Sequence, residues 1–222
     1  MTLSFDAFWS FRSPYSYLAT PRLTKLAAEY DVEIKVRPVY PLAVRVDGFF
    51  ERQDPRWPMY VGRDCYREAQ RLGMTFGPPR PDPIVMNMAT REIAKDQPYI
   101  GRLTHLGQAA ADAGHGLPFI TEVSKLIWGG QVQGWNEGDH LAQATARAGL
   151  DLEQLQRIID TDGERLEAAI QASHARMDEV GHWGVPTMVF EGEPFFGQDR
   201  IDTLIWRLQQ HGLALRQVVT KA

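Results

Sequence analysis

The chain reads FRSPYSYLA from residue 11 to residue 19, a stretch typical of the start of a helix. Ser13 suits the N-cap position, where its oxygen accepts a backbone amide hydrogen, and Pro14 suits the first helical turn, where a missing N–H costs nothing. The free amides and the dipole at a helix start favour negative charge. This helix start is the first candidate site, and the alternative interpretation is a routine serine cap.

Strand patterns flank the predicted helix. Residues 3–9 alternate, but with apolar side chains in both sets, which is typical of a strand covered on both faces. Residues 32–36 alternate Val and Ile with charged residues, which indicates a second strand. Near the end of the chain, residues 187–190 and 194–196 are strand-like around a hairpin turn at 191–193, and a helix follows with Ile201 and Leu204 on one face.

The middle of the chain has no strand pattern. Helical segments separated by Gly and Pro breaks are expected at residues 59–72, 84–95, 100–113, 118–127, 139–148, 152–159 and 164–180. The order βαβ, then helices, then ββα predicts an α/β fold whose sheet is assembled from both chain ends. We expect a discontinuous domain of residues 1–40 and 183–222, with residues 41–182 as an inserted all-helical domain.

The charge and composition of the chain limit the classes of molecule that it is expected to bind. The 222 residues carry a net charge of −4 without a long basic run, which disfavours nucleic-acid binding. We see no secretory signal at the start and no apolar run long enough to span a bilayer, so we expect a cytoplasmic protein without a membrane partner. The single cysteine, Cys65, is expected to be buried and structural. The six histidines show no metal-ligand spacing, so no metal site is expected.

Two further motifs lie late in the sequence. Gly184-Val185-Pro186-Thr187 precedes the strand at 187–190. A cis-proline there leaves the backbone before it free to pair with an extended peptide, and a plain trans-proline is the alternative. Residues 195–200, FFGQDR, lie at another helix start, which suits a carboxylate, while Asp199 is able to pair with an ammonium group or simply to act as a cap.

The first motif has a counterpart in known proteins. Thioredoxin-like oxidoreductases carry Cys-x-x-Cys at such a helix start, where a thiolate is stabilised. Ser13 and Ser16 occupy those two positions here, so the chain supplies no sulfur of its own. The site is still suited to stabilise a thiolate that arrives on a ligand.

Together these motifs resemble the 2-hydroxychromene-2-carboxylate isomerase family, which is close to the kappa-class glutathione transferases within the DsbA-like group of thioredoxin folds. The resembling blocks are residues 11–19, 134–141, 148–151 and 184–200. The resemblance implies a thioredoxin-like fold (βαβ … ββα) with a helical insertion, and glutathione as the cofactor. It implies one catalytic residue, Ser13, which hydrogen-bonds the glutathione sulfur. The implied glutathione-binding residues are Ser13, Val185, Phe196, Gly197, Gln198 and Asp199.

The resemblance also implies an activity. The expected enzyme is a glutathione-dependent isomerase that interconverts a 2-hydroxychromene-2-carboxylate with trans-o-hydroxybenzylidenepyruvate, a small aromatic substrate of aromatic catabolism. The family also suggests a homodimer. The alternatives are a kappa-like glutathione S-transferase and a non-redox thioredoxin-like module that binds peptides.

The chain departs from the family in two places. Arg12 stands just before the serine, where a small or apolar residue is common, and is expected to adjust the charge near the sulfur. Residues 44–53 do not match the family pattern, and Arg45, Arg52 and Gln53 are the candidates there for ligand contact. Three tryptophans either line a hydrophobic substrate pocket or belong to the core. They are Trp128, Trp135 and Trp183.

Overall fold

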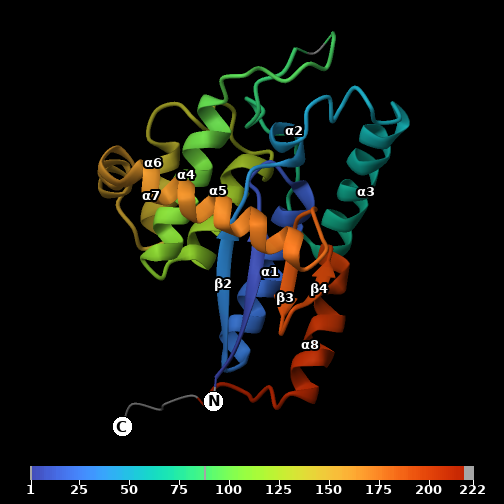
Figure 1. Ribbon diagram of the computed structural model, residues 1–222, viewed down its shortest axis with the longest axis vertical. Coiled ribbons are helices and arrows are strands. Elements are labelled where there is room, and N and C mark those ends of the chain that lie inside the picture. Colours follow the sequence, from blue (N-terminus) through green and yellow to red (C-terminus); the bar gives the residue numbers. More distant parts are fainter. Residues whose placement is uncertain (1, 88, 218–222) are drawn as a thin grey trace.

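The computed structural model describes residues 2–87 and 89–217, so the first residue and the last five residues of the predicted discontinuous domain lie outside it. Four strands form one sheet in the order β2-β1-β3-β4. They are β1 (Leu3–Trp9), β2 (Val32–Pro38), β3 (Thr187–Phe190) and β4 (Glu193–Phe196). β1 is parallel to β2 and antiparallel to β3, and β4 is antiparallel to β3. The sheet is therefore built from both chain ends, as predicted (Figure 1).

The strand directions bring four segments to one edge of the sheet. β1, β2 and β4 end at this edge and β3 begins there, because parallel strands end together and antiparallel strands run oppositely. The segments that meet are residues 10–13, 39–46, 182–186 and 197–200. We call this the upper edge, after its position in Figure 1.

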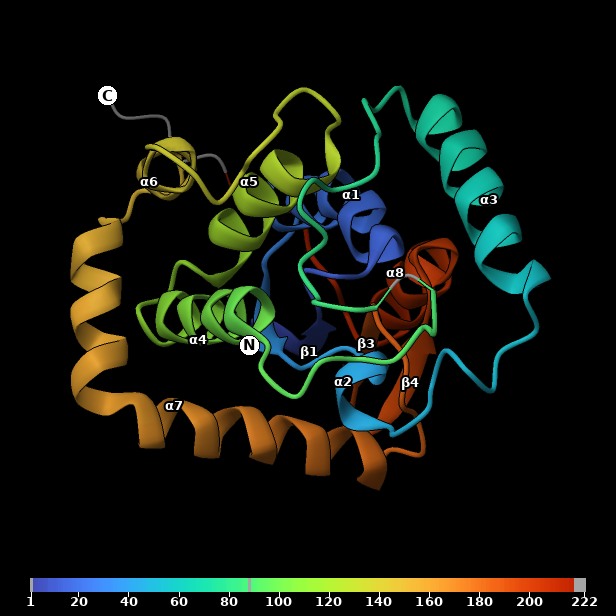
Figure 2. The ribbon, with the colours of Figure 1, turned by 90° about the horizontal axis from the view of Figure 1, so that it is seen from above.

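Helices cover both faces of the sheet. α1 (Pro14–Glu29) and α8 (Ile201–Gln210) lie on one face, and the second half of α7 (Leu152–Glu179) crosses the other face, as the view from above shows (Figure 2). The remaining helices are α2 (Leu42–Arg45), α3 (Arg56–Leu72), α4 (Pro98–Asp112), α5 (Gly116–Trp128), α6 (His140–Arg147) and the 3₁₀ turn η1 (Gln198–Arg200). Among the described residues, no helix is both long and apolar enough to cross a membrane.

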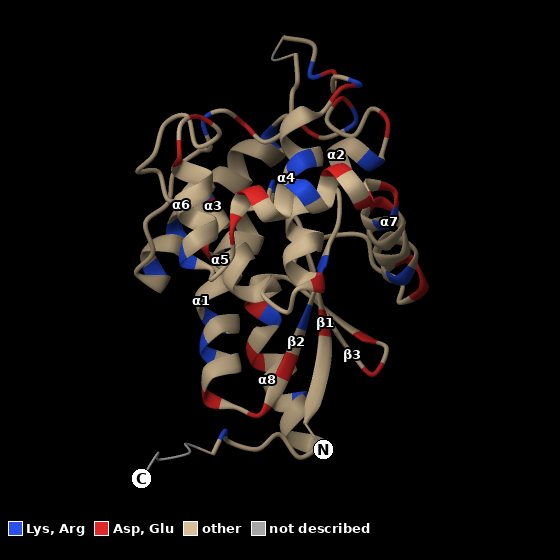
Figure 3. Ribbon diagram, turned by 90° about the vertical axis from the view of Figure 1, so that its left-hand side faces the viewer, with Lys and Arg blue, Asp and Glu red and all other residues tan. Residues whose placement is uncertain are grey.

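The alternation in β1 divides its side chains between two apolar clusters. Trp9 belongs to the main core, whereas Phe8 packs on the opposite face with Met177 of α7 and Val189 of β3. This confirms a strand that is covered on both faces. Basic and acidic positions are interspersed along the helices that face the viewer in Figure 3, so charge is not gathered into one block on this side.

The main core extends from the sheet into the helices between β2 and β3. Phe11, just after β1, meets Phe119 of α5 edge to face at 6.1 Å between ring centroids. Trp128 at the end of α5 donates its indole N–H to the Phe11 carbonyl over 2.8 Å. The proposed division at residues 41–182 stays a prediction, but both parts contribute side chains to one apolar cluster.

One predicted helix is wrong. Residues 84–87 and 89–95 form no helix but a loop closed by an isolated bridge between Met86 and Ile93, and Met88 lies outside the described residues. The Asn87 side chain accepts the Ala89 amide over 2.9 Å, an Asx-type contact that competes with helix formation. Arg91 adopts a φ of 63°, which a right-handed helix excludes.

Two other differences concern which segments form separate helices. The helices predicted at 152–159 and 164–180 are the two arms of α7, which bends at Asp162 (φ −121°, ψ 20°) and turns a corner in Figure 2. The short helix α2 was not predicted, because four residues are too few for a periodic pattern.

Candidate functional site

Ser13 lies at the upper edge as the N-cap of α1. Its hydroxyl oxygen accepts the Ser16 amide hydrogen over 3.2 Å, which confirms the predicted cap. The same hydroxyl donates to the Val185 carbonyl over 3.2 Å. The start of α1 and the Val185–Pro186 segment are therefore in direct contact, although 172 residues separate them in the sequence.

The Val185–Pro186 segment presents unpaired backbone at this edge. The peptide bond between the two residues is cis. Among the described residues, the Val185 N–H has no hydrogen-bond acceptor, and the Val185 carbonyl meets only the Ser13 hydroxyl. A buried or half-buried amide usually has a partner, so this N–H is available to an extended ligand.

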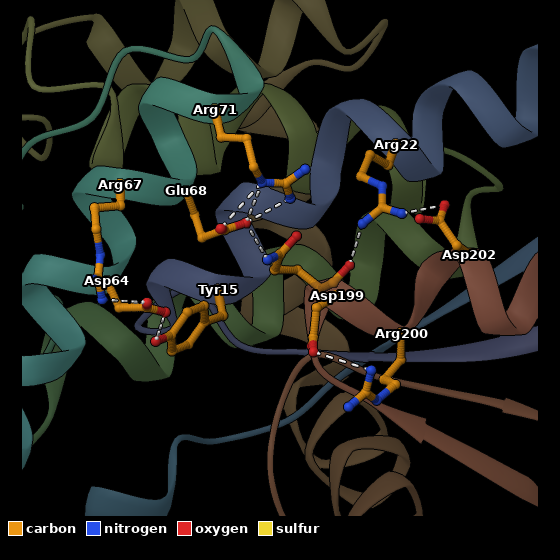
Figure 4. A network of polar contacts seen from close by, with 10 residues as sticks. Tyr15, Arg22, Asp64, Arg67, Glu68, Arg71, Asp199, Arg200 and Asp202 are labelled. Carbon is orange, nitrogen blue, oxygen red and sulfur yellow. Dashed lines mark hydrogen bonds and ion pairs between the residues drawn. The ribbon is translucent and has the colours of Figure 1, made fainter.

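A cavity of about 530 Å³ lies beside the contact between Ser13 and Val185. Its wall combines the start of α1, one face of α3 and the segment after β4 (Figure 4). The lining residues are Tyr15, Asp64, Glu68, Arg71, Val185, Phe196, Gly197, Gln198, Asp199 and Arg200. We call it the upper cavity. Five of the six predicted residues therefore line one cavity, and Ser13 is not a lining residue but contacts one of them, Val185. The five are Val185, Phe196, Gly197, Gln198 and Asp199.

The upper cavity carries charges of both signs. Arg71 pairs with Glu68 at 2.7 Å, and this guanidinium holds the pKa of Glu68 below its usual range. Asp199 is exposed and lies 3.4 Å from the Arg200 guanidinium. Acidic groups therefore stand next to basic ones around the same space, an arrangement that suits a zwitterionic ligand.

Two hydrogen bonds attach α3 to the rest of the site. The Tyr15 hydroxyl donates to Asp64 over 2.7 Å, and the Gln198 amide donates to Glu68 over 2.9 Å. Burial, followed by the hydrogen bond to Asp64, raises the pKa of Tyr15, so its hydroxyl stays protonated as a donor. On the other side Arg22 of α1 donates to the Gln198 carbonyl over 2.6 Å. Gln198, which is buried, thus connects α1, α3 and η1.

The turn before η1 requires glycine. Gly197 has φ 104° and ψ 150°, a region that L side chains rarely adopt. A Cβ atom at this position would collide with the Asp199 carboxylate oxygen. The absence of a side chain therefore allows Asp199 to fold back over its own turn.

Sequence reasoning missed the contribution of α3. Asp64, Glu68 and Arg71 follow helical spacing and share one face of α3, but that spacing is common on solvated helices. Only the docking of α3 against Tyr15 and Gln198 turns this face into a cavity wall. The i, i+4, i+7 spacing of these three residues predicts that they share one face of a helix, but it does not predict which part of the protein that face packs against.

The other candidate residues are placed as follows. Arg45 donates to the Trp183 carbonyl over 2.6 Å and so contacts the segment before Val185, whereas Arg52 turns back to the Gly48 carbonyl. Trp128 and Trp135 are buried in the core, and Trp183 is 61% exposed. Trp183 stacks on His182 at 4.8 Å, which adds an aromatic surface beside the site.

Two small side chains near the site, Cys65 and Ser16, are fully buried. Cys65 is fully buried, as predicted, and burial raises the pKa of its thiol to about 12. It is therefore a neutral packing residue at neutral pH. Ser16 is also fully buried, and among the described residues its hydroxyl has no hydrogen-bond partner. Within that same part of the chain, no group of three or more His, Cys, Asp or Glu side chains is arranged to hold a metal ion.

The sheet order, the helix start at Ser13 and the cis-proline segment opposite it define a thioredoxin-like protein with serines at both redox positions. The particular family follows from comparison with known proteins. The chain belongs to the DSBA-like thioredoxin domain family, whose model matches residues 5–209. No curated protein sequence matches the chain.

Solved structures share this fold at low sequence identity. A 2-hydroxychromene-2-carboxylate isomerase is 21% identical with a TM-score of 0.70, covering 94% of this chain and 96% of that one. A probable DsbA oxidoreductase from Streptomyces coelicolor is 15% identical with a TM-score of 0.64, covering 99% and 95%. The cytosolic disulfide reductase DsbM from Pseudomonas aeruginosa, in a structure with GSH, is 19% identical with a TM-score of 0.58, covering 93% and 100%. The predicted α/β thioredoxin-like fold is confirmed.

Proposed function

We propose that this protein binds glutathione in the upper cavity and uses it to isomerise an aromatic, conjugated carboxylic acid. The observation that carries the proposal is the contact of the Ser13 hydroxyl, at the start of α1, with the Val185 carbonyl before the cis-proline. The likeness to the 2-hydroxychromene-2-carboxylate isomerase and to DsbM with GSH agrees with it. The substrate we propose is a 2-hydroxychromene-2-carboxylate or its open form, trans-o-hydroxybenzylidenepyruvate.

The residues present fit the three parts of glutathione. The γ-glutamyl end is a zwitterion, and the upper cavity offers Asp199 to an ammonium and the backbone amides of Gln198 and Asp199 to a carboxylate, since the Gly197 amide already donates to the Pro186 carbonyl. The cysteinyl unit has a backbone N–H and C=O, which match the available N–H and C=O of Val185. The sulfur then belongs near Ser13.

In this proposal, the protein stabilises the negative charge on the glutathione sulfur. The Ser13 hydroxyl already lies at the positive end of the α1 dipole, and rotation away from the Val185 carbonyl frees its hydrogen for an anion. A donor aimed at developing charge contributes about 3 to 4 kcal/mol in comparable sites. Bound glutathione supplies a thiolate that adds reversibly to a conjugated carbon, which lets the former double bond rotate.

Calorimetric titration with glutathione, followed by product analysis, tests the proposal. We expect saturable binding and a product of trans-o-hydroxybenzylidenepyruvate with unchanged mass. A product whose mass has increased by glutathione would assign the protein as a kappa-like transferase instead. The absence of glutathione binding would remove both assignments.

Substitution of Ser13 tests its role in turnover. Ser13→Ala removes the donor and is expected to lower kcat by about 10² to 10³. It also removes a helix cap, which costs about 1 kcal/mol of stability. Ser13→Thr is the matched control, because it keeps both the hydroxyl and the cap. Unchanged turnover in Ser13→Ala would contradict the assigned role.

Peptide binding is a second candidate function, which the available Val185 N–H favours. An extended peptide adding a strand at this edge would use the same backbone groups. Thermal unfolding separates the two candidates, because a ligand that binds only the folded state raises the melting temperature. Stabilisation by an extended peptide and none by glutathione would replace the enzyme proposal with this one.

A further inference from the structure

Arg12 lies next to the candidate sulfur position. It follows β1 and directly precedes Ser13, so its backbone is part of the upper edge. Its side chain is only 24% exposed, which is low for an arginine at a surface edge. A guanidinium that is so covered normally has its donors satisfied.

The Arg12 guanidinium is held on its Nε side by an ion pair with Asp82. Its Nε lies 2.8 Å from Asp82 Oδ1, yet that oxygen accepts the Ile84 amide hydrogen over 3.0 Å. The Nε is buried, and among the described residues it forms no hydrogen bond of acceptable geometry. Its central carbon lies 5.9 Å from the Phe50 ring centroid. Asp82 and the packing thus fix the buried Nε side of the group, while the two Nη groups form no hydrogen bond among the described residues and are the donors left for a ligand.

An aromatic surface continues from Arg12. The Phe50 ring meets Phe49 at 5.2 Å between centroids, and Phe49 meets Trp57 of α3 at 6.1 Å. Trp57 is 42% exposed and the two phenylalanines are partly buried. A planar cation beside three aromatic rings matches a ligand that combines an aromatic ring with a carboxylate.

A second arginine at this edge, Arg45, already binds a protein group. Arg45 uses Nη2 for the Trp183 carbonyl at 2.6 Å, so it holds the segment before Val185. Burial lowers the pKa of Arg45, which makes its charge costly to keep without that contact. The Nε of Arg45 is buried without a partner among the described residues, as that of Arg12 is, so the two arginines differ in their Nη groups. Arg45 gives one Nη to a backbone carbonyl and Arg12 gives none among the described residues, so Arg12 is the better candidate for a substrate anion.

We propose that Arg12 is a specificity-determining residue that binds the carboxylate of the second substrate, with the substrate ring against Phe49 and Phe50. The inference rests on the proposed function and deepens it by assigning the group that selects acids over neutral analogues. A competing role is to adjust the charge at the sulfur. That role predicts an effect on glutathione, whereas substrate recognition predicts an effect on the carboxylate.

The test compares trans-cinnamate with cinnamamide, which differ only in the charged group. Dissociation constants are measured by calorimetry for the wild type, Arg12→Gln and Arg12→Lys, with and without saturating glutathione. Arg157→Gln is the control, because Arg157 is an exposed residue on the first arm of α7. We expect Arg12→Gln to weaken cinnamate at least about tenfold, since hydrogen bonds to charged groups are strong, and to leave cinnamamide unchanged.

The ratio of the two dissociation constants makes the test independent of small losses of stability. If Arg12→Gln does not fold, Arg12→Lys carries the test. It keeps the charge and loses the planar fork, so the dissociation constant of cinnamate divided by that of cinnamamide should still rise. An equal loss for acid and amide, an unchanged ratio, or no cinnamate binding by the wild type would overturn the inference. If the wild type binds cinnamate more tightly than cinnamamide, and only Arg12 accounts for the difference, but glutathione does not bind, then the role of Arg12 is supported and the proposed function is contradicted.

Discussion

Ser13 shows how one hydroxyl connects distant parts of the chain. It accepts the Ser16 amide within α1 and donates to Val185, so a local cap also fixes a long-range contact. The cap was predictable from the sequence, because it depends on neighbouring residues. The contact with Val185 was not derivable from local pattern, since it depends on the sheet that brings the two segments together.

The buried residue His174 makes the stability of the protein depend on pH. His174 is 9% exposed, and its Nε2 accepts the Tyr40 amide hydrogen over 3.0 Å, so it must be neutral there. Burial, helped by the Arg45 charge and opposed by Glu167 and Asp178, lowers the pKa of His174 from 6.5 to about 4. Its contribution to stability is therefore complete above pH 6.5 and is lost as the pH falls to about 4.

Denaturant unfolding at a series of pH values tests this prediction. Between pH 6.5 and about 4, the wild type should lose up to about 3 kcal/mol through this group. His174→Gln cannot titrate, so its unfolding free energy should fall less over the same interval. Parallel pH curves for the two proteins would mean that His174 is not the group responsible.

At the scale of elements, the turn between β4 and η1 makes one wall of the upper cavity. Gly197 and Gly192 both have positive φ, at 104° and 82°. A Cβ atom at Gly197 would collide with Asp199, whereas at Gly192 it would meet nothing within 4 Å. Substitution of Gly192 therefore measures only the free-energy cost of a Cβ atom at positive φ. Substitution of Gly197 measures this cost together with the effect on the binding site.

Alanine substitutions at these glycines test the turn. Each should lower the free energy of unfolding by about 1 to 2 kcal/mol, because a Cβ atom disfavours positive φ. Only Gly197→Ala should also displace Asp199 and weaken glutathione binding, which calorimetry measures. Equal glutathione affinities in both variants would show that the Gly197 turn is not part of the binding site.

Elements with strong local signals were predicted and those set by tertiary contacts were not. β1, α1, β3 and α8 follow from alternation, caps and helical spacing. The loop around Asn87 was wrongly predicted as a helix, because a side-chain contact and the φ of Arg91 override the apolar pattern. The face of α3 that lines the upper cavity was visible as a charged pattern, but its partners Tyr15 and Gln198 were not.

At the scale of the whole molecule, one core joins the sheet to the helices between β2 and β3. Phe119 is fully buried on α5 and contacts Phe11, which follows β1. The segment that carries Ser13 therefore rests on the helical region. The order of elements predicted this arrangement of the chain, whereas the shared core depends on packing that no local pattern describes.

Unfolding experiments test whether the shared core makes folding cooperative. We expect tryptophan fluorescence and far-ultraviolet circular dichroism to report one coincident transition. Phe119→Ala should lower the free energy of unfolding by about 3 to 5 kcal/mol while keeping that coincidence. Met59→Ala is the control, since Met59 is 61% exposed and should change stability little. Two separate transitions would indicate that the helical region folds by itself.

The central claim is that the start of α1 stabilises the sulfur anion of glutathione through Ser13. The most direct measurement is the pH titration of thiolate ultraviolet absorbance for glutathione bound to the wild type, Ser13→Ala and Ser13→Thr. We expect a thiol pKa well below that of free glutathione in the wild type and in Ser13→Thr, and a clearly higher pKa in Ser13→Ala. The same thiol pKa with and without the hydroxyl would contradict it.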